Sequence, residues 1–111
     1  MQKCVFTGQE TDMLNNGVPC SREGRELLNK VHTKYNEKMK QQFIEKAMGR
    51  AKENAEESGE EVKEDILRET FAQLAPQISK KNMLKYIKIG VGDALQTLEE
   101  VKNENNETLG E

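Results

Sequence analysis

A row of apolar residues spaced four apart runs from residue 27 to residue 55 and is the longest regular feature of the sequence. The row consists of Leu27, Val31, Tyr35, Met39, Phe43, Ala47, Ala51 and Ala55. Four residues advance a helix by about 400°, so each step moves the row about 40° around the axis, and the whole row winds by about 280°. A straight helix cannot bury this row on one flat face.

Two arrangements are compatible with the winding row. The helix breaks, most simply near Gly49, or it continues and its two halves pack against different partners. We expect the second arrangement. The first half then packs through Leu28, Val31, Tyr35 and Met39, and the second half through Ile44, Met48, Ala51 and Ala55. The second half is covered either by the later helices of the same chain or by another chain.

Start and stop signals place the helix boundaries. Ser21 follows Pro19 and is a plausible N-cap, so the first helix is predicted over residues 22–57. The run ENAEESGEEVKED, residues 53–65, holds seven acids around Ser58 and Gly59, which indicates a helix end and a turn. A second helix is predicted over residues 60–75, before Pro76.

The last predicted helix covers residues 77–103 and has the cleanest amphipathic pattern. Its apolar residues are Leu84, Ile87, Val91, Ala94, Leu95, Leu98 and Val101, which fall within an arc of about 120°. Gly90 and Gly92 lie inside it, at a cost of about 1 kcal/mol each relative to Ala, and indicate a kink or a close helix crossing. Residues 104–111 form a polar tail that we expect to fray.

The N-terminal 20 residues predict a small β-hairpin or knuckle. Cys4–Phe6 is a short β-prone run, and Asn16-Gly17 is a pair typical of hairpin turns. The predicted fold is therefore mainly α: a single domain, residues 1–111, with this hairpin followed by three helices, the first of them long. Helices should exceed half of the chain.

Charge is distributed in blocks along the chain. Residues 21–52 carry +5, 53–75 carry −6, 76–98 carry +3 and 99–111 carry −4, for a net charge of −3 over the whole sequence. Blocks of opposite sign pair within the chain when helices fold back on each other, or they serve separate partners. Internal pairing is the interpretation that we favour.

The sequence offers too few suitable residues for a metal site or a catalytic site. Zinc requires about four ligands, whereas the chain offers Cys4, Cys20 and one histidine, His32, about 18 Å along the predicted helix from Cys20. Thr7 stands where a Cys-x-x-Cys knuckle would place its second ligand. At the same distance, His32 is too far from Cys20 to act as the base that a nucleophilic cysteine requires. We expect no metal, no cofactor and no enzymatic activity, with Cys4 and Cys20 as the ligands of an alternative zinc-knuckle protein.

The sequence predicts the cellular compartment through the segments that it lacks. No apolar run approaches the roughly 18 residues of a membrane span, and the N-terminus has no apolar signal-peptide region. Two cysteines without a secretory signal indicate reduced thiols. The expected location is cytoplasmic, without membrane contact.

Two classes of binding function remain open. The preferred hypothesis is a non-enzymatic regulatory protein that binds a protein partner or a second copy of itself. Its candidate contact residues are Ile44, Met48, Ala51, Ala55, Glu57, Glu60 and Glu61. The alternative is a nucleic-acid-binding regulator that uses basic helix faces. Its candidate residues are Lys81, Lys85, Lys88, Arg22 and Arg25.

The segments KCVFTGQETD and GVPCSREGRELL, within residues 3–28, carry a resemblance to a family. They resemble the start of small uncharacterised phage proteins with a degenerate zinc knuckle. The resemblance implies a compact accessory protein that acts by binding a host factor in the cytosol of an infected bacterium. It supplies no catalytic residues.

Overall fold

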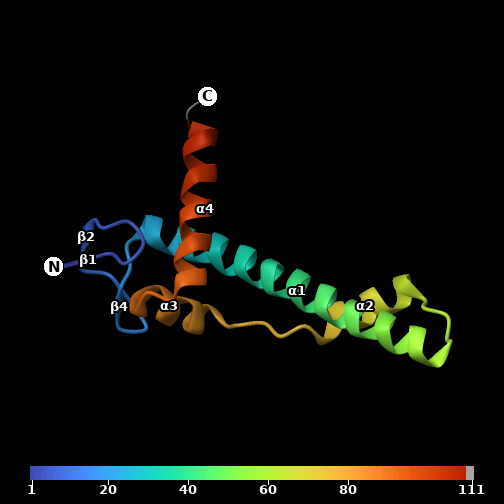
Figure 1. Ribbon diagram of the computed structural model, residues 1–111. Coiled ribbons are helices and arrows are strands. Elements are labelled where there is room, and N and C mark those ends of the chain that lie inside the picture. The colour runs from blue at the N-terminus through green and yellow to red at the C-terminus, as the bar shows by residue number, and fades with distance from the viewer. Residues whose placement is uncertain (110–111) are drawn as a thin grey trace. The chain divides into compact units, whose positions relative to one another are not determined.

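A computed structural model describes the backbone of residues 1–109 and the side chains of residues 1–104 (Figure 1). The protein is mainly helical, at 68% of the chain. The described residues form four helices: α1 (Arg22–Ser58), α2 (Glu64–Leu74), α3 (Lys80–Ile89) and α4 (Gly92–Leu109). A mainly α fold with a long first helix after a short β region is therefore confirmed.

The β region contains two small hairpins where the sequence predicted one. Strand β1 (Gln2–Lys3) pairs antiparallel with β2 (Glu10–Thr11), and β3 (Leu14–Asn15) pairs antiparallel with β4 (Val18–Pro19). Asn16 and Gly17 connect β3 to β4 with φ angles of 52° and 79°. Both angles are left-handed, as a two-residue type I′ turn requires, so the Asn-Gly signal is confirmed.

Helix α1 begins and continues as the sequence predicted. The Ser21 hydroxyl accepts a hydrogen bond from the Gly24 N–H at 3.1 Å, which confirms Ser21 as the N-cap. The helix passes through Gly49 without a break and ends at Ser58. Gly59 then adopts a left-handed φ of 72°, and the Glu60 N–H returns to the Ala55 carbonyl at 3.1 Å.

The predicted start of the second helix at residue 60 is wrong. Glu60 belongs to the turn that closes α1, and α2 begins four residues later at Glu64. Its end at Leu74, with Ala75 extended before Pro76, agrees with the sequence.

The single helix predicted over residues 77–103 is also wrong. Gly90 has a left-handed φ of 80°, and its N–H bonds to the carbonyls of Tyr86 and Ile87. The Val91 N–H bonds to Tyr86 as well, at 3.0 Å, which completes a Schellman motif that ends α3. Helix α4 then starts at Gly92. The tail that was expected to fray from residue 104 is helical to Leu109, and residues 110 and 111 lie outside the described part.

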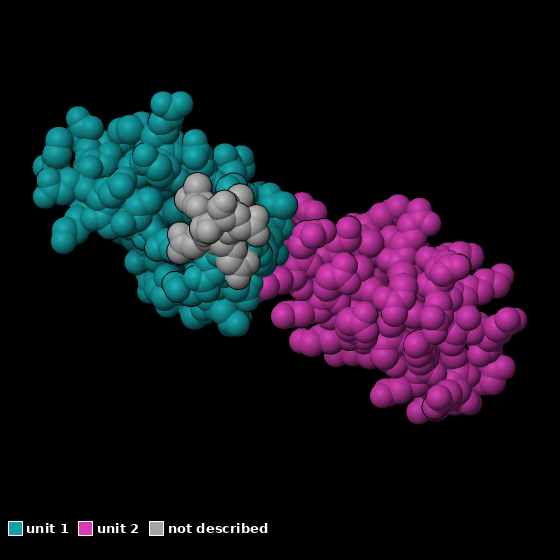
Figure 2. Space-filling view, turned by 90° about the horizontal axis from the view of Figure 1, so that it is seen from above, with its two compact units in different colours: residues 1–35, 78–111 teal, residues 36–77 magenta. Residues whose placement is uncertain are grey.

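The chain divides into two compact units (Figure 2). The first unit contains residues 1–35 and 78–111, and the second contains residues 36–77. Helix α1 therefore contributes its residues 22–35 to the first unit and residues 36–58 to the second. The single domain predicted for residues 1–111 stays a prediction.

The first unit holds the main hydrophobic core. Its buried apolar side chains are Cys4, Phe6, Val18, Cys20, Leu27, Leu28, Val31, Met83, Leu84, Ile87, Ala94, Leu98 and Val101. They come from the hairpins, the start of α1, α3 and α4. Lys34 on α1 also pairs with Glu100, at 3.7 Å, and with Glu104 on α4. A basic block thus meets an acidic block inside the unit.

The second unit is a helical hairpin of α1 and α2. Phe43 and Phe71 meet edge to face, with ring centroids 6.5 Å apart and planes at 82°. Two exposed ion pairs join the helices, Lys52 with Glu64 at 2.9 Å and Arg68 with Glu45 at 3.3 Å. The later helix of the same chain therefore packs against the second half of α1 at Phe43, and the favoured internal charge pairing is seen here too.

The Schellman motif at Gly90 predicts that alanine substitutions at Gly90 and Gly92 have different effects on stability. Gly90→Ala forces a side chain into a left-handed conformation and should reduce the free energy of unfolding by about 1 kcal/mol. Gly92→Ala is the matched control, because Gly92 has no left-handed φ and open space around its Cα, and it should leave stability unchanged or slightly higher. Denaturant unfolding of both variants measures the difference, and equal effects would contradict the assigned role of Gly90.

Candidate functional site

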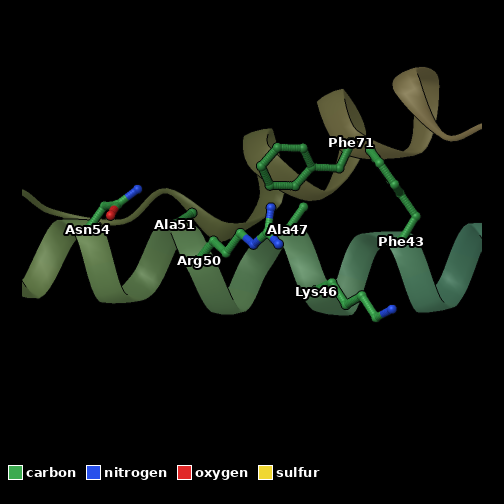
Figure 3. A pocket seen from close by; sticks show the side chains of 7 residues that line it. All are labelled: Phe43, Lys46, Ala47, Arg50, Ala51, Asn54 and Phe71. Atoms are coloured by element: carbon green, nitrogen blue, oxygen red, sulfur yellow. The ribbon is translucent and has the colours of Figure 1, made fainter.

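A groove lies on the second unit, between residues of α1 and α2 (Figure 3). Its volume is about 410 Å³, and the lining residues are Phe43, Lys46, Ala47, Arg50, Ala51, Asn54 and Phe71. Helix α1 supplies all of them except Phe71, which reaches over from α2. The groove therefore follows one face of α1.

Small side chains create the groove. Phe43, Ala47 and Ala51 are consecutive members of the winding row and are half-buried. Phe71 covers the row at Phe43, but Ala47 and Ala51 have only a methyl group each, so the space above them stays open. From Phe43 to Asn54 the groove spans about 16 Å of helix, at about 1.5 Å per residue.

The groove has an apolar floor and basic residues along its lining. Lys46 and Arg50 are exposed, stand four residues apart on α1 and take part in no ion pair within residues 1–104. Figure 3 shows the Arg50 side chain extending beside Ala47. The groove therefore places positive charge beside apolar surface.

The predicted contact residues divide between the interior and the surface. Ile44 and Met48 are only 5% and 2% exposed, so they are not available to a partner, and their assignment to a contact surface is corrected. Each follows a residue of the row by one position, about 100° around the axis, so they lie beside the row rather than on it. Ala51 lines the groove, and Ala55 is half-buried further along α1.

The predicted acidic contacts lie where α1 turns into α2. Glu57, Glu60 and Glu61 are exposed there. A shallow depression of about 520 Å³ occupies this turn, lined by Lys52, Ala55, Glu56, Gly59, Glu60, Val62 and Glu64. Its carboxylates make it a poor site for an anion.

The sequence alone indicates no binding role for Lys46, Arg50, Asn54 or Phe71. The sequence contains part of the signal, since Phe43, Ala47 and Ala51 belong to one row of apolar residues. Only the pairing of α1 with α2 shows that these residues share a groove.

The basic residues of the alternative hypothesis are all at the surface of the first unit. Lys81, Lys85 and Lys88 are exposed on α3, within about 60° of each other around its axis. Arg22 and Arg25 are exposed at the start of α1, where Arg25 lies with its guanidinium 3.4 Å from the Leu14 carbonyl oxygen. The three lysines form one basic face.

Cys4 and Cys20 are brought together, although 16 positions separate them in the sequence. Both are free thiols and buried, at 3% and 0% exposure. Burial alone would raise the pKa of Cys4, but hydrogen bonds from the hydroxyls of Ser21 and Thr7 and from backbone groups outweigh burial and lower that pKa to about 6. Burial and the neighbouring Cys4 raise the pKa of Cys20.

Metal ligation lacks a third side chain in the described residues. No group of three or more His, Cys, Asp or Glu residues is arranged there to hold a metal ion. The His32 Nε2 atom lies 2.7 Å from the Ile78 carbonyl oxygen. Its ring therefore contacts the segment that precedes α3, within the first unit. The absence of metal stays a prediction.

No helix in residues 1–109 combines the length and the apolar character of a membrane span.

Comparison of the chain with protein-family models, with curated proteins and with solved structures finds no significant match to any of them.

The lowered pKa of Cys4 predicts a pH-dependent contribution to stability. Between about pH 6 and pH 9 the native thiol is ionised while the unfolded thiol is protonated, so the unfolded state binds more protons and the free energy of unfolding should rise with pH. The gain is lost as pH falls through about 6.

Ultraviolet titration of thiolate absorbance, with Cys4→Ser as the control, should show one ionisation near pH 6 that the variant lacks. An ionisation of Cys4 near pH 9, and no difference in the pH dependence of unfolding between the two proteins, would contradict the assignment.

Proposed function

We propose that the protein is a non-enzymatic binding protein whose groove on α1 and α2 receives an acidic amphipathic helix of a partner protein. The observation that carries the proposal is the groove itself: an apolar floor with two cationic residues that take part in no ion pair within residues 1–104. Helix-in-groove recognition uses apolar anchors at spacings of three and four residues, and the open row over Ala47 and Ala51 accepts that spacing.

The shape of the groove favours a helix over a small molecule. It extends along about three turns of α1, whereas small-molecule sites enclose most of their ligand. Lys46 and Arg50 stand one turn apart, so carboxylates one turn apart on the ligand helix can pair with both.

The source of the partner is part of the same proposal. The resemblance of residues 3–28 to small phage proteins supports a host protein as the partner. A second copy of this chain is the other candidate, since the run at residues 53–65 is itself acidic. Light scattering separates these outcomes, because self-binding gives a concentration-dependent dimer.

Binding of a model helix tests the proposal. The probe is a fluorescent amphipathic peptide with Leu at heptad-spaced positions and Glu on the flanks, and anisotropy measures its affinity. Ala51→Asp introduces a carboxylate into the groove floor and should weaken binding at least tenfold. The double variant Lys46→Glu, Arg50→Glu should weaken it by a similar factor and reverse its salt dependence.

The charge-matched control is Lys80→Glu, Lys81→Glu on α3, which should bind the peptide as the parent does. Circular dichroism of each variant verifies that the helices remain. Equal affinity of the parent and Ala51→Asp for the peptide would rule out the groove as the binding site.

Nucleic-acid binding is the second candidate, and the exposed basic face of Lys81, Lys85 and Lys88 favours it. If this face contacts phosphates, affinity for duplex DNA or RNA should fall steeply with salt, and Lys85→Glu, Lys88→Glu should abolish it. Lys46→Glu, Arg50→Glu serves as the control that should leave nucleic-acid binding largely unchanged. Weak binding that the α3 variant does not alter would exclude this candidate.

A further inference from the structure

The backbones that carry Cys4 and Cys20 are hydrogen-bonded neighbours. The Val5 N–H donates to the Pro19 carbonyl oxygen at 3.1 Å. That N–H belongs to the peptide group that follows Cys4, and that carbonyl belongs to the peptide group that precedes Cys20. This hydrogen bond brings the two backbones side by side, as a disulfide requires, since it spans Cα separations of about 4.4–6.8 Å.

Both sulfur atoms also face the same point of α1. A Cβ atom placed on Gly24 would lie 2.6 Å from the Cys4 Sγ and 3.3 Å from the Cys20 Sγ. Glycine therefore leaves the space in which the two sulfurs converge, in the first turn of the helix. The Ser21 Oγ lies 3.3 Å from the same point, so a hydroxyl accompanies the thiols.

We infer that Cys4 and Cys20 are a redox pair that forms a reversible intramolecular disulfide on reaction with a peroxide. The inference is independent of the groove and of its partner. It assigns a modification site to two thiols that a binding function alone does not require.

The reaction has two steps. The Cys4 thiolate attacks one oxygen of hydrogen peroxide, the O–O bond breaks, and the released hydroxide takes a proton to leave water and Cys4 sulfenic acid. The Cys20 sulfur then attacks the Cys4 sulfur, the S–O bond breaks, and the departing hydroxide takes the Cys20 proton as a second water. Two thiols are oxidised to one disulfide while one peroxide is reduced to two waters.

The order of the two cysteines follows from their surroundings. Hydrogen bonds from Ser21 and Thr7 stabilise the thiolate of Cys4, which becomes the attacking group. Cys20 donates its S–H to the Ser21 carbonyl oxygen at 3.7 Å and stays protonated until the sulfenic acid forms. Arg25 is a charged neighbour of this pair and acts on Cys20.

Mass spectrometry of the full chain tests the inference. The reduced protein, treated with hydrogen peroxide, should lose the mass of two hydrogen atoms, leave no thiol to alkylate after denaturation, and recover both thiols with dithiothreitol. The melting temperature should rise by at least about 5 °C on oxidation, since the bond closes the loop from residue 4 to residue 20.

Two serine variants test which cysteine attacks the peroxide and which one closes the disulfide. Cys20→Ser should accumulate a Cys4 sulfenic acid that dimedone traps, while Cys4→Ser should leave Cys20 unmodified under the same treatment. Circular dichroism checks that each variant is folded, and the wild-type result stands without them. Cysteines that stay reduced, that oxidise to sulfinic acid or that link two chains would overturn the inference.

Discussion

The winding of the apolar row on a continuous α1 is the constraint on which the rest of the structure depends. Because the helix does not break at Gly49, the apolar residues of its two ends face different directions, and each half needs its own cover. Leu28 and Val31 join the core of the first unit. Phe43 meets Phe71 of α2 in the second. Two compact units on one helix are the result.

The second unit is covered thinly, and this is the origin of its groove. Helix α2 has 11 residues, none of them fully buried, and Ile66 and Leu74 on it are 59% and 66% exposed. A short helix with one large aromatic contact cannot fill the space over Ala47 and Ala51. The structure thus pairs a well-packed unit with one that keeps apolar surface open beside basic residues, and the binding proposal depends on that difference.

Local structure could be predicted from the sequence where one or two residues determine the backbone geometry. Ser21 as an N-cap and the turn at Asn16-Gly17 depend only on neighbouring backbone groups. Gly90 was recognised as unusual, but whether a glycine kinks a helix or ends it depends on the side chains packed around it. The inner position of Ile44 and Met48 and the meeting of Cys4 with Cys20 required the path of the chain, which spacing along the sequence does not contain.

Amide hydrogen exchange on α1 tests the central claim, which is that its two halves are stabilised by different parts of the chain. Phe71→Ala removes the aromatic cover of the second unit. Exchange should accelerate in residues 36–58 and 64–74, while residues 24–35 keep the rates of the parent protein. Val31→Ala is the reciprocal control and should accelerate exchange in residues 24–35 and 80–101. Acceleration of the whole of α1 by Phe71→Ala, or of none of it, would contradict the account.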